Sequence, residues 1–248
     1  MAAFMGNRPN FSLTMLLMVF IILGGCSQDG AINEARQSGD NSGINPIDNN
    51  GGGSSDNPDD EVMPCQEFDF SPKFDIGTTF PPWESSPYNL PFKKGERYLV
   101  HQGNTSGFGH SGFWRYGYDF LMDIGTEVYA ARLGHVVYTF EDASDGNANL
   151  TNLITIQHKD GTVALYSHLT KNGSLVEIGE EVERGQLIGL SGNTGNTGGI
   201  PHLHFSVHPC PGLPGLPDET NCPSQPVTFS NTEENPDGLG TGECYTAN

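Results

Sequence analysis

The sequence is short of basic residues. Its 248 residues include 11 lysines and arginines against 30 aspartates and glutamates, a formal net charge of −19. Nucleic acids and anionic membrane surfaces are bound through clusters of positive charge, so this balance argues against both as partners. The surplus of acidic side chains favours solubility.

Long hydrophobic runs are also missing. The apolar run LTMLLMVFIIL at 13–23 is too short to cross a hydrocarbon core of ~30 Å at about 1.5 Å per residue. A short apolar run after Arg8 is typical of a secretory signal. The following LGGC resembles a bacterial lipoprotein signal, so we expect residues 1–26 to be a signal peptide with Cys26 lipidated. An ordinary signal peptide or a short anchor helix is the alternative. In lipoproteins of this class, Ser27 favours the outer membrane, facing the periplasm.

Helical periodicity is absent from the rest of the chain, where we find no amphipathic pattern longer than about two helical turns. Strand-like runs follow Gly95 instead: RYLVHQ, two apolar runs around Gly134 in EVYAARLGHVVYTF, QLIGLSG and HLHFSVH. NLITIQHKDGTVALYSHL is typical of a hairpin that turns at 159–161. With 33 glycines available for tight turns, the pattern predicts an all-β domain of antiparallel strands.

Residues 27–64 differ in composition from the strand-rich part. They are rich in Asn, Gly, Ser, Asp and Pro, as in NNGGGSSDNPDDE, and have no apolar periodicity. We expect a disordered acidic linker here and a folded domain over 65–248. The Phe- and Pro-rich segment 65–95 is expected to wrap that domain, and we consider the hypothesis that it lies across the site as an inhibitory segment.

Cysteines are few, five in all. With Cys26 set aside, four remain, and an exported chain with an even number favours disulfides. Of the three possible pairings, we favour Cys210–Cys222, which closes a short Pro/Gly loop, and Cys65–Cys244, which ties the ends of the domain together. Free thiols are the alternative, and the lack of a CxxC pair disfavours a structural zinc site.

Three of the eight histidines lie in PHLHFSVH, residues 201–208. Side chains at i and i+2 of a strand leave the same face, so His202 and His204 point together. Two imidazoles and a carboxylate make a natural zinc shell, whereas solvated or core histidines are the alternative. His168 at the end of a hairpin strand favours the metal site. Asp119 also favours the metal site, because a carboxylate buried in an apolar strand needs a partner. The alternative for Asp119 is a residue that caps the following turn.

Three segments together resemble the LytM/lysostaphin-type zinc metallopeptidases, peptidase family M23: DFLMDIGTEVYAARLGHVV, ITIQHKDGTVALYSHL and VEIGEEVERGQLIGLSGNTGNTGGIPHLHFSV. The resemblance covers about residues 95–209. It implies a two-layer, sandwich-like domain (the duplicated hybrid motif) with long loops. It also implies one zinc ion per chain bound by Asp119 and His204. His168 and His202 are then the catalytic residues that orient or deprotonate the attacking water.

One motif departs from the family's usual form, which is HxGxD. Here Arg115 stands where the histidine is expected, and a guanidinium has no lone pair to offer a metal. The nearest histidine, His110, lies nine positions before Asp119, on the opposite face of a straight strand. Gly109 and Gly112 flank it and allow a loop that curls back, and some family members resemble this SHxGxxRYAxDF form. We therefore expect His110 to be the third zinc ligand. The alternative is a loop histidine beside a two-ligand or empty site.

The remaining histidines have weaker spacing arguments. His208 continues the face of His202 and His204 but is expected to end the strand outside the site. His158 precedes the hairpin turn and is expected to have no chemical role.

The resemblance implies a zinc-dependent endopeptidase that hydrolyses amide bonds in the stem peptides or cross-bridges of peptidoglycan. In a Gram-negative cell the expected bond is the D-alanyl–diaminopimelate cross-link, an inference from habitat rather than from residues. The alternative is a non-catalytic relative that has lost metal ligands and activates a partner cell-wall amidase. Arg115 supports that alternative, and the retained aspartate and histidines speak against it.

Overall fold

Ten strands and two short 3₁₀ helices make up the regular structure of the part of the chain that this computed structural model describes, residues 65, 67, 77–107, 109–210, 216 and 220–248. The expected signal peptide, Cys26 and the expected linker lie outside the described residues. The elements are η1 Trp83–Ser85, β1 Arg97–Gln102, η2 Gly112–Trp114, β2 Tyr118–Leu121, β3 Glu127–Tyr129, β4 Gly134–Phe140, β5 Asn152–Gln157, β6 Val163–Ser174, β7 Glu181–Val182, β8 Leu187–Ser191, β9 His202–His208 and β10 Cys244–Thr246.

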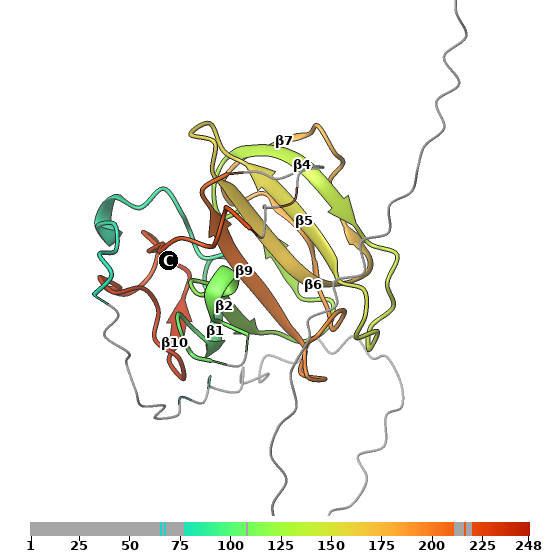
Figure 1. Cartoon of the computed structure of the whole chain (residues 1–248), viewed down its shortest axis with the longest axis horizontal. Helices are drawn as coiled ribbons and strands as arrows, with labels where there is room; N and C mark the ends of the chain where they lie inside the picture. The colour runs from blue at the N-terminus through green and yellow to red at the C-terminus, as the bar shows by residue number, and fades with distance from the viewer. Residues whose placement is uncertain (1–64, 66, 68–76, 108, 211–215, 217–219) are drawn as a thin grey trace, which may run out of the picture. The chain divides into compact units, whose positions relative to one another are not determined.

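The strands pair antiparallel throughout, in the order β10-β1-β2-β9-β6-β5-β4-β7. Figure 1 shows β9 between β2 and β6, with β5 and β4 beyond them. The predicted hairpin is β5–β6, and its turn is closed by a hydrogen bond from the His158 amide to the Thr162 carbonyl (2.8 Å). The expectation of an all-β antiparallel fold is confirmed.

A second layer forms where β6 bends. The first part of β6 pairs with β5 and β9, whereas the part from Leu169 to Ser174 pairs with β8, which in turn pairs with β3. A side chain at Gly189 of β8 would lie 3.1 Å from Cδ1 of Ile154 in β5, although these two strands do not pair. The β3–β8 pair therefore covers one face of the main sheet, which is the two-layer arrangement that the resemblance implied.

Strand β9 is buried on both faces, and the two faces differ in chemistry. Leu203, Phe205 and Val207 enter the hydrophobic core, where each large apolar side chain contributes roughly 1.5–3 kcal/mol by burial. The alternate positions, from His202 to His208, are all polar and equally buried. Because side chains alternate between the two faces of a strand, every second residue of β9 is polar and lies on the face opposite the core. Buried polar groups of this kind need hydrogen-bond or metal partners.

The C-terminal segment joins the sheet. Cys244–Thr246 pairs with β1 as strand β10, and the side chains of Val227, Phe229 and Leu239 are part of the core. Nothing in the sequence indicated this strand, because CYT is too short to show an alternating pattern. Disulfides join Cys65 to Cys244 and Cys210 to Cys222, the pairing that the spacing favours.

The segment 77–95 packs against the C-terminal segment and the core. Phe92 contacts Phe120, Leu90 donates its amide hydrogen to Asn231 (2.7 Å), and the Thr78 hydroxyl lies 2.7 Å from that of Tyr116. Among the described residues, no hydrogen bond or ring contact joins 78–95 to the histidines of the site described below. No helix in the described part is long and apolar enough to span a membrane.

Candidate metal centre

Asp119 and His204 are direct neighbours across the β2–β9 pair. Residues opposite each other in an antiparallel pair project from the same face, with Cβ atoms roughly 4.5–5.5 Å apart. Here Nδ1 of His204 lies 2.7 Å from Oδ1 of Asp119, and both side chains are buried. The strand register alone therefore brings the predicted aspartate and histidine together.

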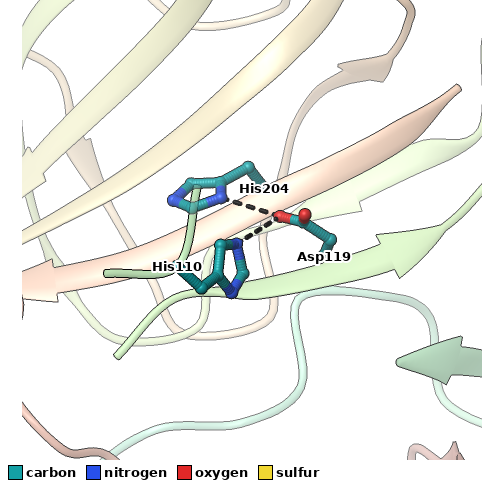
Figure 2. Close-up of side chains that lie close together, drawn as sticks. All are labelled: His110, Asp119 and His204. Carbon is teal, nitrogen blue, oxygen red and sulfur yellow. Dashed lines mark hydrogen bonds and ion pairs between the residues drawn. The ribbon is translucent and has the colours of Figure 1, made fainter. Parts of the chain in front are cut away.

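His110 reaches the same carboxylate from a loop. Its Nε2 lies 3.1 Å from Oδ1 of Asp119, and its Nδ1 lies 2.9 Å from the carbonyl oxygen of Gly103. The flanking Gly109 and Gly112 have φ of +110° and +55°, backbone conformations that a side chain would strain. Figure 2 shows both imidazoles directed at one carboxylate oxygen. The loop curls back as the sequence predicted.

Arg115 takes no part in this group. Its side chain is exposed, and its carbonyl accepts a hydrogen bond from the Thr105 amide (2.8 Å). The position that holds a histidine in the HxGxD form is thus occupied by a residue that faces solvent, and His110 supplies the missing imidazole from five residues earlier.

The donor atoms fit a divalent metal ion. The ligand atoms of His110, Asp119 and His204 all lie within 4.8 Å of one another. Since Nδ1 of His110 faces a carbonyl oxygen, it carries the hydrogen, and Nε2 of the neutral ring offers a lone pair to a carboxylate that also has only lone pairs. A cation must lie between them, either a proton on the imidazole or a metal. Two imidazole nitrogens and a carboxylate oxygen are ligands that zinc prefers.

The pKa shifts follow from the same contacts. Burial alone lowers the pKa of His110, but the Asp119 carboxylate outweighs burial, and the pKa of His110 lies above its usual value. Burial raises the pKa of Asp119, yet hydrogen bonds from His110 and His204 hold it well below the usual range. Burial keeps the pKa of His204 below its ordinary value despite the carboxylate. Asp119 is therefore an anion that requires positive charge beside it.

His168 and His202 flank the metal group without joining it. Their rings lie 4.6 Å apart, and Nε2 of His202 lies 3.7 Å from Oδ2 of Asp119. Nδ1 of His202 bonds to the Ile200 carbonyl (2.7 Å) and Nδ1 of His168 to the Thr194 carbonyl (2.6 Å). Because each Nδ1 must hold the hydrogen, each Nε2 presents a lone pair. Burial and the neighbouring His202 and His204 lower the pKa of His168 to about 3, so this ring is neutral.

His208 lies outside the metal group, as predicted, but it supports its surroundings. The buried ring bonds to the Cys222 carbonyl (2.8 Å) and to the Ser206 hydroxyl (2.9 Å). It also stacks on Phe113 of η2, with ring centres 4.6 Å apart.

Two neighbours of His204 were missed in the sequence. Trp114 of η2 sets its ring edge-on to His204, with centres 5.4 Å apart. A side chain at Gly117 would come within 2.6 Å of Cε1 of His204. A signal was present for Gly117, because it lies two positions before Asp119 on the same face. Trp114 lies in a glycine-flanked turn without periodicity and gave none.

Residues 114–214 match the family model described as "Peptidase family M23". This region is therefore similar to peptidase family M23. The match begins four residues after His110, so the matched region takes one of its three candidate ligands from a segment that the family model does not cover.

Named relatives match part of the chain. The chain is 46% identical over 91 residues, 37% of its length, to the "Peptidoglycan DD-endopeptidase ShyA" of Vibrio cholerae, and covers 19% of that protein. It is 38% identical over 115 residues, 46% of its length, to lysostaphin of Staphylococcus simulans, covering 21% of it. The chain thus spans about a fifth of the length of these curated relatives. Among solved structures, a zinc-containing peptidase from Vibrio cholerae is similar at 33% sequence identity and a TM-score of 0.38. The match covers 50% of the present chain and 37% of the chain in that structure.

Proposed function

We propose that this chain is a zinc-dependent endopeptidase that hydrolyses amide bonds in peptidoglycan. The observation that carries the proposal is the convergence of His110, Asp119 and His204 on one point, beside two histidines whose Nε2 atoms are free to accept a proton. Relatives named as a DD-endopeptidase of peptidoglycan and as lysostaphin support the substrate class.

The hydrogen bonds indicate which residues bind the metal and which transfer the proton. His110, Asp119 and His204 would hold a zinc ion, which would supply a Lewis acid able to lower the pKa of water to about 7 and to polarise a carbonyl. His168 and His202 are held by backbone carbonyls through Nδ1, so the Nε2 atom of one of them accepts the proton of the attacking water. While it holds that proton, the imidazolium stabilises the negative charge that develops on the carbonyl oxygen, and it then gives the proton to the leaving amine.

The non-catalytic alternative loses its main support. It rested on Arg115 in place of a ligand, but His110 brings the number of candidate ligands to three. A protein that only binds a partner has no need for five buried or half-buried groups hydrogen-bonded in this way, which are His110, Asp119, His168, His202 and His204.

Further parts of the proposal concern the setting of the enzyme. We propose a lipid anchor on Cys26, an outer-membrane location facing the periplasm, and an acidic linker that lets the domain reach the cell wall. The disulfides agree with export. The relatives include both a DD-endopeptidase and a glycyl-glycine endopeptidase, so the D-alanyl–diaminopimelate bond is proposed only for a Gram-negative wall.

Digestion of purified peptidoglycan tests the proposal. The folded domain is incubated with peptidoglycan, with and without a chelator, and released fragments are identified by mass. We expect new amino termini at one peptide bond, no release with chelator, and recovery with added zinc. Fragments that also appear with His204→Ala, or activity that resists chelation, would contradict the proposed function.

A further inference from the structure

We propose that Asp145, in the loop between β4 and β5, is a positioning residue that fixes the imidazole of His168. The inference rests on the proposed function, in which His168 is a catalytic residue. Asp145 touches neither the metal group nor His168 itself, so its action is indirect.

His168 needs support because its backbone is unusual. Its φ is +67°, in the left-handed region that residues other than glycine rarely adopt. It lies at the bend of β6, and among the described residues its ring makes one hydrogen bond, from Nδ1 to the Thr194 carbonyl (2.6 Å). Whatever holds Thr194 against β6 therefore also sets where Nε2 points.

Part of that support is buried. The Thr194 hydroxyl donates to the Leu169 carbonyl (2.8 Å) and accepts from the Asn152 amide (3.0 Å). The Asn152 side chain in turn bonds to both backbone groups of Ala143 and to the Thr170 carbonyl. These contacts belong to the folded core and explain how the loop and strand are built.

Asp145 adds a connection between the two segments that flank His168. One carboxylate oxygen accepts from the Thr170 hydroxyl (2.5 Å), two residues after His168, and the other accepts from the Asn193 amide (2.7 Å), one residue before Thr194. The Gly146 amide donates to the Asn193 carbonyl (2.8 Å) and completes the link. Hydrogen bonds to a carboxylate are about twice as strong as neutral ones. A single side chain thus joins the strand that carries the imidazole to the loop that orients it.

Removal of the Asp145 carboxylate should leave the metal site intact and disturb the orientation of His168, a proposed base. For Asp145→Ala we expect about a tenfold lower kcat, at the low end of the roughly 10–100-fold effect of outer-shell partners, with KM and zinc content unchanged. Asp145→Asn can still accept from Asn193 and can donate to Thr170, so it should retain most of the activity. Asp142→Ala, an exposed aspartate of the same loop, is the matched control and should behave as the unmodified protein.

The deciding measurement is the Nδ1 hydrogen of His168, observed by NMR in the zinc-loaded protein labelled with ¹⁵N-histidine. The resonance should be protected from exchange in the unmodified protein, Asp145→Asn and Asp142→Ala, and lost by exchange in Asp145→Ala. If Asp145→Ala keeps both the protected resonance and its kcat, the inference is overturned. Loss of the resonance without a fall in kcat overturns the catalytic part of it.

Two further outcomes remain decisive. If Asp145→Ala does not fold, Thr170→Val removes one of the two hydrogen bonds to the carboxylate while keeping a branched side chain, and the same two measurements apply to it. If the unmodified protein cleaves no peptidoglycan, the proposed function fails, whereas the resonance still reports whether Asp145 orients His168.

Discussion

At the scale of single residues, the metal group depends on which imidazole nitrogen faces the Asp119 carboxylate. His110 uses Nε2, because its Nδ1 is bound to the Gly103 carbonyl, whereas His204 uses Nδ1. Strand periodicity was enough to place His202 and His204 on one face, and Asp119 was a candidate because an acid buried in an apolar strand needs a partner. The ligand roles of Asp119 and His204 came from the family resemblance. For His110 the flanking glycines only allowed a loop that curls back, because its position is set by glycine turns and one carbonyl rather than by a period.

The ligand role of His110 gives the first prediction. His110→Ala should lower zinc affinity by more than the roughly 10–100-fold expected for loss of an outer-shell partner, because a donor atom is removed. Arg115→Ala is the matched control and should bind zinc normally, since Arg115 is exposed. Competition with a chromogenic chelator measures both. Equal losses in the two variants would show that His110 is not a ligand.

Gly117 gives a second prediction at this scale. Its φ lies outside the left-handed region, so alanine is acceptable to the backbone, but the added Cβ would lie 2.6 Å from Cε1 of His204. Gly117→Ala should therefore displace the ring, at an overpacking cost of about 1–3 kcal/mol, and weaken zinc binding. Urea unfolding and zinc titration report the two effects. Full zinc affinity in this variant would mean that the ring has room to shift without losing the metal.

At the scale of elements, the strands that position the site were largely predictable. Alternation gave β1 and β9, and the Lys-Asp-Gly turn gave the β5–β6 hairpin. The bend of β6 was not predictable, because it depends on positive φ at His168 and Asn172, which only tertiary contacts enforce. Strand β10 and the turn η2 were missed because each has only three residues, too few to show a hydrophobic periodicity.

The hairpin carries a prediction about acid stability. Burial lowers the pKa of His158 to about 4, and its Nδ1 bonds to the Leu133 carbonyl. The folded state therefore keeps this ring neutral, and the unfolded chain, with a pKa near 6.5, binds the proton first. The resulting stability is complete above about pH 6.5 and is lost as pH falls toward 4, by up to about 3 kcal/mol.

Urea unfolding of the metal-free protein at pH 7 and pH 5 checks this expectation. His158→Asn can still donate to Leu133 but does not titrate, so its stability should change less between the two pH values than that of the unmodified protein. His135→Asn, at an exposed histidine of β4, is the matched control for replacing a histidine by asparagine. If the stability of His158→Asn changes with pH as much as that of the unmodified protein, the acid sensitivity belongs to other groups. His208 is one of them, because burial also lowers its pKa to about 4.

At the scale of the whole molecule, the two disulfides close loops of very different length. Cys65–Cys244 spans 179 residues and Cys210–Cys222 spans 12. Since the entropy removed from the unfolded chain grows with loop length, the long loop is worth about 5 kcal/mol and the short one about 3 kcal/mol. The paired replacement Cys65→Ser with Cys244→Ser should therefore lower the free energy of unfolding more than Cys210→Ser with Cys222→Ser. Denaturant unfolding measures both, and a larger loss for the short loop would contradict this account.

The central claim is that one metal ion lies between His110, Asp119 and His204. Anomalous diffraction at the zinc absorption edge, from crystals of the folded domain grown with zinc, tests it most directly. We predict a single strong peak within bonding distance of His110 Nε2, Asp119 Oδ1 and His204 Nδ1. No peak at that point in the presence of excess zinc, or the guanidinium of Arg115 in its place, would contradict the account.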